Sequence, residues 1–200
     1  MSQLIKLKYP LILASQSPRR QKLLHQIGVN FELFPSSIDE SEHPLQIKPE
    51  DYAAQLSLKK SQDVASKINR KAIVLGADTI VCLEDQILNK PVDSKDAVKM
   101  LNKLSGNTHT VFTGVSLVEP ISKSILTEVK ATRVTFKTLT NEEIETYVEG
   151  GSPMDKAGAY GIQDDTGALF IKYIEGCYYN IVGLPLEMLY SMLLKFNEMI

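Results

Sequence analysis

The sequence is poor in cysteine and histidine, and neither residue type is arranged to hold a metal ion. The two cysteines, Cys82 and Cys177, are far apart and both lie in apolar stretches. We therefore expect two buried free thiols in a reducing compartment rather than a disulfide. The three histidines show no ligand-like spacing, so we assign no metal role to His25, His43 or His109.

Long apolar runs are also absent. Residues 1–10 carry charge and contain no sustained apolar run before a cleavage site. No stretch approaches the length that a membrane-spanning helix needs. We therefore expect a cytoplasmic protein with no membrane partner.

The chain lacks an excess of basic residues. Its 22 Lys and Arg stand against 24 Asp and Glu, which gives a formal net charge of -2. Proteins that bind nucleic acid polymers usually carry a strong basic excess, because neutralised phosphates supply their affinity. This balance argues against a nucleic acid polymer as partner, whereas a small phosphorylated substrate needs only a few local cations.

The composition is that of a globular protein. A hydrophobic content of 44% in 200 residues suffices for one large domain or two small lobes. No repeat or Gly/Ser linker divides the chain, so we expect a single domain over residues 1–200. Apolar periodicity predicts an α/β protein with a mixed sheet. Strands are expected at 11–14, 31–34, 73–83 (interrupted at 76–78), 110–118, 124–136 and 169–174, and helices at 17–28, 49–68, 94–104, from 140, and at 185–196. Ser17 and Ser94 are the expected N-caps of their helices, Gly28 is the expected end of the first helix, and Thr140 with Glu143 is expected to form a capping box. The second helix is expected to face inward with Tyr52, Ala53, Leu56 and Val64.

A segment rich in serine and arginine, Ser15 to Arg20, lies between an expected strand and a helix start. The first amides of a helix have no internal partner and carry the positive end of its dipole, so they attract phosphate. Arg19 and Arg20 would add bidentate donors. Adjacent cations are unfavourable at a helix start, which itself suggests a bound anion. The alternative is a capped helix with two solvated arginines.

A second segment, Gly76-Ala77-Asp78-Thr79, places an acid inside an apolar run. A carboxylate in such a position is costly unless it is paired, hydrogen-bonded or bound to a metal. Gly76 permits close approach of another backbone. The alternative is that Asp78 lies at a strand end and forms a turn.

Three other charged residues carry weaker signals. Lys90 precedes Pro91, so it is held extended, and its point charge suits phosphate. Lys60 lies near the middle of an expected helix, and Glu40 lies in a polar stretch. For each of these residues, the alternative is a solvated surface position.

Small residues dominate the segment 155–163, and they let a backbone bend tightly. Within it, Tyr160 could stack on a base, and Gln163 could read a base edge through its amide. The alternative is a flexible loop with a buried tyrosine. The segment 180–185 is expected to form a structural turn before the last helix.

Taken together, these segments resemble the Maf family of septum-formation-inhibitor-like nucleotide pyrophosphatases. The resemblance extends from Leu13 to about Leu186. Each motif is weak alone, and their order and separation carry the match. The matching segments are 15–20 with Leu23-Leu24, 76–79, Lys90-Pro91, Met100-Leu101, 104–106, His109, Val111, 113–115, 156–163 and 183–185.

The resemblance implies two α/β lobes around a deep cleft, with a mixed, strongly bent sheet similar to that of inosine triphosphatases. It implies hydrolysis of a nucleoside triphosphate to the monophosphate plus pyrophosphate, with Mg²⁺ or Mn²⁺. By position, the catalytic residues would be Asp78, Lys60 and Lys90, and the metal ligands Glu40 and Asp78. The substrate-binding residues would be Ser15, Arg19, Arg20, Thr79 and Gln163.

The resemblance also bears on substrate choice. Arg19, Thr79 and Gln163 look like the branch that prefers dTTP and UTP. The similar branch that prefers 7-methyl-GTP tends to carry Trp at the first position and Glu at the last. This chain departs from the family after Gln163, because Asp164 and Asp165 stand where a glycine and a shorter loop are usual. Those acids could shift specificity or join the metal site.

Two other functions remain compatible with the sequence. The chain could be a nucleotide-binding regulatory module, consistent with the family's association with cell division arrest, or a broad house-cleaning hydrolase of non-standard nucleotides. An acid beside a set of cations favours catalysis, because a pure sensor does not need a buried Asp78. A homodimer is compatible with the resemblance, but no sequence pattern demands one.

Overall fold

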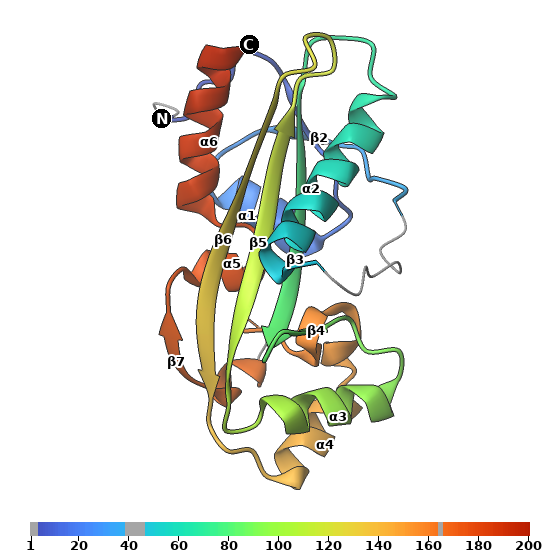
Figure 1. Ribbon diagram of the computed structural model, residues 1–200, viewed down its shortest axis with the longest axis vertical. Coiled ribbons are helices and arrows are strands. Elements are labelled where there is room, and N and C mark those ends of the chain that lie inside the picture. Colours follow the sequence, from blue (N-terminus) through green and yellow to red (C-terminus); the bar gives the residue numbers. More distant parts are fainter. Residues whose placement is uncertain (1–3, 39–46, 164–165) are drawn as a thin grey trace. The chain divides into compact units, whose positions relative to one another are not determined.

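The computed structural model describes residues 4–38, 47–163 and 166–200 (Figure 1). The chain divides into two compact units, each with its own internal packing. Unit 1 comprises Met1–Asp78, Thr113–Lys130 and Gly183–Ile200, and unit 2 comprises Thr79–Phe112 and Ala131–Val182. The predicted deep cleft and the single domain over residues 1–200 stay predictions.

The strands form a mixed sheet with the order β2-β1-β3-β5-β6-β7, and β4 pairs with β3 (Figure 1). Strand β1 runs parallel to β2 and β3, whereas β3–β4 and β6–β7 are antiparallel. The predicted α/β class with a mixed sheet is therefore confirmed. The bounds are β1 Leu11–Leu13, β2 Phe31–Leu33, β3 Ile73–Leu83, β4 Gln86–Leu88, β5 Thr108–Val118, β6 Ile125–Phe136 and β7 Ile171–Glu175.

Unit 1 contains the helices α1 (Pro18–Gln26), α2 (Pro49–Ala65) and α6 (Leu186–Met199). As predicted, the Ser17 side chain caps α1, and Gly28, at φ +70°, ends its turn. Helix α2 ends three residues before its predicted end. The Ser66 hydroxyl donates to the Asp63 carbonyl at 2.7 Å, a bond that competes with continued helix.

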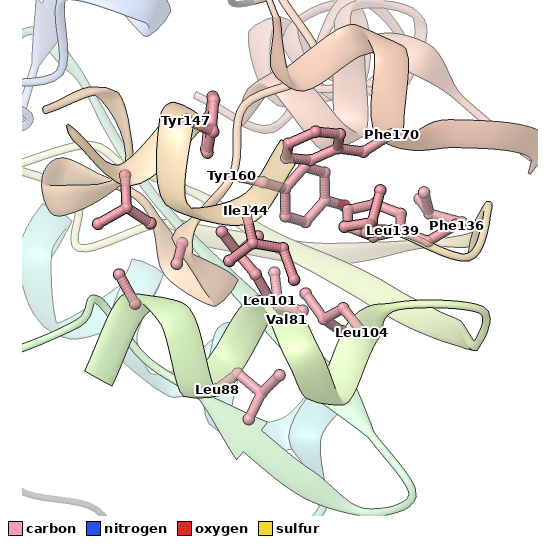
Figure 2. Close-up of a cluster of buried hydrophobic side chains, with 14 of the residues drawn as sticks. Val81, Leu88, Leu101, Leu104, Phe136, Leu139, Ile144, Tyr147, Tyr160 and Phe170 are labelled. Carbon is pink, nitrogen blue, oxygen red and sulfur yellow. The ribbon is translucent and has the colours of Figure 1, made fainter. Parts of the chain in front are cut away.

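Unit 2 contains α3 (Ser94–Leu104), α4 (Asn141–Glu149) and α5 (Tyr178–Val182), with short 3-10 turns η1 (Ser152–Asp155), η2 (Ala157–Ala159) and η3 (Gly167–Phe170). The predicted capping box of Thr140 and Glu143 is present at the start of α4. Figure 2 shows the core of this unit, where α3, α4 and the aromatic side chains meet. Its largest members include Leu101, Leu104, Phe136, Ile144, Tyr147, Tyr160 and Phe170.

Several local predictions were wrong. Strand β3 is continuous through residues 76–78, and α3 is capped by Asp93, whose carboxylate accepts from the Asp96 amide at 2.7 Å. The short β4 was not predicted, because Glu84 and Asp85 make its turn with positive φ and no glycine signals it. Cys82 is buried as expected, whereas Cys177 is only half-buried, and both are free thiols.

None of the described helices is long and apolar enough to cross a membrane.

Candidate active site

Ser15 and Arg20 form a buried polar cluster at the end of β1 in unit 1. Their exposed fractions are 7% and 8%. Arg20 donates from Nη1 to the Ser15 hydroxyl at 3.0 Å and from Nε to the Gly183 carbonyl at 2.9 Å. The cluster joins the start of α1 to the turn before α6, a turn that the sequence predicted to be structural.

The Ser15 hydroxyl is arranged to donate to a ligand. Its oxygen accepts from the Ser17 amide at 3.2 Å as well as from Arg20. Ser15 is the acceptor in both of these bonds, which are the ones that it makes with described residues. Its hydroxyl hydrogen is therefore available to donate to a phosphate oxygen. Arg19 is half-exposed on the first turn of α1, where helix amides and guanidinium groups favour an anion.

Asp78 and Lys60 form a buried ion pair, also in unit 1. The Lys60 ammonium lies 2.5 Å from Asp78 Oδ1, and the two side chains are 7% and 8% exposed. The sequence left two alternatives for Asp78, a turn at a strand end or a paired carboxylate, and the paired carboxylate is correct. The alternative of a solvated Lys60 is wrong, because packing turns that face of α2 toward the sheet.

The two clusters lie on or just after two neighbouring parallel strands, β1 and β3. Strands β1 and β3 run parallel, with Leu13 opposite Leu75, and the Ala14 amide donates to the Leu75 carbonyl. Ser15 follows directly, and Asp78 lies three residues beyond Leu75. Ser15 therefore follows the carboxyl end of β1, whereas Asp78 lies within β3, the strand that pairs with β1.

Three other predicted site residues can be placed. Thr79 (half-buried), Lys90 (exposed) and Gln163 (exposed) belong to unit 2. Within unit 2, the Gly158 amide donates to the Asn89 carbonyl at 3.0 Å. This bond ties the segment that carries Lys90 to the one that carries Gln163. Glu40 lies outside the described residues.

The segment before Gln163 is held by the core of unit 2. The Tyr160 hydroxyl lies 2.7 Å from His109 Nε2, and the Tyr147 hydroxyl accepts from the Gly161 amide at 3.2 Å. Tyr160 is 5% exposed and packs edge-on against Phe136, with ring centroids 4.8 Å apart (Figure 2). The alternative of a buried tyrosine is therefore correct, and Tyr160 does not stack on a base.

Burial governs the protonation of this aromatic group. It lowers the pKa of His109 to about 4 and raises the pKa of Tyr160. His109 Nδ1 is buried and makes no hydrogen bond to any residue that the structure describes. The neutral ring is therefore the stable form, and protonating it opposes folding.

We expect acid to destabilise the protein through His109. The folded pKa of about 4 lies below the unfolded value near 6.5, so stability is full above pH 6.5 and falls as the pH drops toward 4. The loss across this window is about 3 kcal/mol in the free energy of unfolding. Denaturant unfolding from pH 7 to pH 4 should show a weaker pH dependence for His109→Gln than for wild type. His25→Gln, at an exposed position, should match wild type; equal pH dependence in all three proteins would refute the assignment.

Sequence reasoning missed the role of Asp63 on α2. Its carboxylate accepts from the Ser36 hydroxyl at 3.0 Å, the Ser37 amide at 2.9 Å and the Lys67 ammonium at 2.9 Å. Chiefly the Lys67 bond, aided by the Ser37 amide, lowers the pKa of Asp63 to about 2. Asp63 thereby holds the segment that contains Ser36 and Ser37 against α2. The sequence signal for this contact is weak, because it consists of two adjacent serines.

The described residues contain no group of three or more His, Cys, Asp or Glu side chains that could hold a metal ion. Asp78 is the one predicted metal ligand that can be placed, since Glu40 is not described. One carboxylate is compatible with Mg²⁺, which often binds through one or two carboxylates together with substrate phosphates.

Comparison with known proteins decides the family. The model of the Maf-like protein family matches residues 10–196. The chain belongs to the Maf-like family. A relative from Ruminiclostridium cellulolyticum, named dTTP/UTP pyrophosphatase, is 49% identical over 190 residues, covering 95% of this chain and 97% of the relative. A Salinibacter ruber protein of the same name is 48% identical over 193 residues, covering 96% and 94%.

A solved structure supports the fold of this Maf-like chain. The HAM1 protein from Coxiella burnetii aligns over 94% of this chain and 99% of its own, with a TM-score of 0.51 and 14% identity. At that identity the likeness concerns the fold alone. The resemblance inferred from the sequence motifs is thus confirmed at the level of family and fold.

Proposed function

We propose that this Maf-like chain hydrolyses dTTP and UTP to the monophosphate plus pyrophosphate. The observation that carries the proposal is the buried Lys60–Asp78 pair, which unit 1 holds together with the buried Ser15–Arg20 cluster on the neighbouring strand segment. Two relatives at 48–49% identity are named for this activity. A buried carboxylate paired with an ammonium, in the same unit as a cluster of guanidinium and hydroxyl donors, suits phosphoryl chemistry, in which positioning and charge stabilisation dominate.

The residues of this chain divide the work. Ser15, Arg19 and Arg20 bind phosphate oxygens through a hydroxyl, guanidinium groups and the first amides of α1. Asp78 orients a water molecule and accepts its proton as the anhydride between the α- and β-phosphates breaks. The Lys60 ammonium holds the Asp78 carboxylate in place through their buried ion pair, and Lys60 and Lys90 offset the negative charge that builds on the departing pyrophosphate.

A divalent cation, Mg²⁺ or Mn²⁺, would be held by Asp78 together with triphosphate oxygens, and Glu40 is the second candidate ligand. The fit rests on the donor set, because the Asp78 carboxylate and the triphosphate both offer hard oxygen ligands. When bound, the cation polarises the phosphoryl group.

Arg19, Thr79 and Gln163 are the proposed determinants of the pyrimidine preference. Gln163 is exposed, and its segment is fixed by the contacts of Tyr160 and Gly161, so its amide can be presented in one orientation. The loop after it contains Asp164 and Asp165, which lie outside the described residues. A cytoplasmic location and a homodimer are further parts of the proposal.

The test is turnover of purified protein with Mg²⁺ or Mn²⁺ against dTTP, UTP, CTP, GTP, ATP and 7-methyl-GTP. We expect fast conversion of dTTP and UTP to monophosphate with equimolar pyrophosphate, resolved by chromatography. Equal rates across the panel, or faster turnover of damaged nucleotides, would favour a house-cleaning hydrolase. Folded protein that turns over no nucleotide with metal present would leave a nucleotide-binding regulator. Asp78→Asn protein from the same purification controls for contaminating enzymes.

A further inference from the structure

Helix α2 lies against the sheet of unit 1 with backbone touching backbone. A Cβ atom added at Gly76 on β3 would lie 2.2 Å from the Ser57 carbonyl oxygen and 2.8 Å from the Ser61 amide nitrogen. Gly114 on β5 makes the same kind of contact, 2.2 Å from the Ala53 carbonyl oxygen. Neither glycine has a positive φ, so both are needed for space and not for conformation.

Side chains fix the same helix sideways. The Ser57 and Ser116 hydroxyls are 2.8 Å apart, and Ser116 in turn lies 2.8 Å from the Thr127 hydroxyl on β6. Ser57, Ser61 and Ser116 are fully buried. Two glycines and a chain of three hydroxyls therefore fix the position of α2 on the sheet.

These contacts lie at the candidate active site. Ser57 and Ser61 flank Lys60 along α2, and Gly76 precedes Asp78 by two residues on β3. The ion pair that joins the two elements spans 2.5 Å. A side chain at position 76 would have to move Ser57 from 2.2 Å to at least 3.0 Å, a displacement of about 0.8 Å applied within one turn of Lys60.

We propose that Gly76 is a positioning residue, which sets the distance between α2 and β3 so that the Lys60 ammonium reaches the Asp78 carboxylate. The inference rests on the proposed function and deepens it. Catalytic groups must be held within about 0.5 Å of their working geometry, and a misplacement of about 1 Å can lower a rate about 100-fold. A glycine with no functional group therefore controls the chemistry through the closeness that it permits.

The experiment is a double-mutant cycle of Gly76→Ala and Lys60→Ala, with kcat, KM and Tm measured for dTTP hydrolysis. We expect Gly76→Ala to lower kcat about 10- to 100-fold with little change in KM. In the Lys60→Ala background the same substitution should change kcat by less than about twofold, because the group that it misplaces is already gone.

Gly114→Ala is the matched control. It forces the same clash against α2, but at Ala53, two helical turns before Lys60. Helix α2 can tilt about its contact with Gly76, and this movement leaves Lys60 near Asp78. We therefore expect Tm to fall as in Gly76→Ala, whereas kcat should stay within about threefold of wild type. If Gly76→Ala does not fold, Ser116→Ala is the second variant, because it removes the hydroxyl contact to Ser57 without a clash. It should lower kcat in the wild-type background but not in the Lys60→Ala background.

Two results would overturn the proposal: a folded Gly76→Ala enzyme with wild-type kcat, or kcat losses that multiply independently in the cycle. If Gly76→Ala does not fold, unchanged kcat in Ser116→Ala has the same meaning. Turnover by wild type in the same assay separates these results from failure of the proposed function, in which wild type itself is inactive.

Discussion

Asp78→Asn should lower kcat by about 100-fold or more, because the side chain keeps its shape and loses the negative charge that orients and deprotonates the attacking water. The same change removes the negative charge that faces the buried Lys60 ammonium. Breaking a buried pair costs about 3–5 kcal/mol in the free energy of unfolding, so Tm should fall as well. Steady-state kinetics with dTTP and circular dichroism check both effects on one preparation.

The kinetic loss must be separated from the loss of stability. Asp51→Asn, at an exposed position in the first turn of α2, is the matched control and should retain wild-type kcat and Tm. Assays well below the Tm of Asp78→Asn ensure that folded enzyme is compared. Wild-type kcat from folded Asp78→Asn protein would remove Asp78 from the mechanism.

Arg20→Lys should lower kcat/KM for dTTP by about 100-fold although the positive charge is kept. The guanidinium donates at the same time to the Ser15 hydroxyl and the Gly183 carbonyl, through Nη1 and Nε. A lysine has one ammonium at the end of a flexible stem and cannot reproduce two donors in a rigid fork. The Ser15 hydroxyl and the first turn of α1 then lose their fixed position beside the phosphates.

The control for this prediction is Arg70→Lys, which alters an exposed ion pair with Glu32 in the same unit. An exposed pair contributes about 0–1 kcal/mol, so we expect no change in kinetics or Tm. Isothermal titration with a non-hydrolysable dTTP analogue should show weaker binding for Arg20→Lys only. Equal kinetics for the two variants would mean that Arg20 acts as a simple charge or not at all.

Features that depend on neighbours along the chain could be predicted from the sequence. The cap at Ser17, the capping box at Thr140 and the inward face of α2 all follow from hydrogen bonds or periodicity within a few residues. The order of short motifs likewise indicated the family, because that signal lies in the linear sequence. Predictions failed where the local signal was ambiguous, as at the cap of α3, or absent, as at the glycine-free turn before β4.

The tertiary structure alone decided which groups meet. In the sequence, Lys60 cannot be distinguished from other helical lysines. The packing of α2 on β3 brings it to Asp78, which is 18 residues away. Arg20 meets Gly183 across 163 residues, and Tyr160 proves to be a core residue only because His109 and Phe136 surround it. The sequence determined which chemical groups are available, since residue type alone sets charge and hydrogen-bonding capacity. Their pairing and burial depend on long-range packing, which no local pattern encodes.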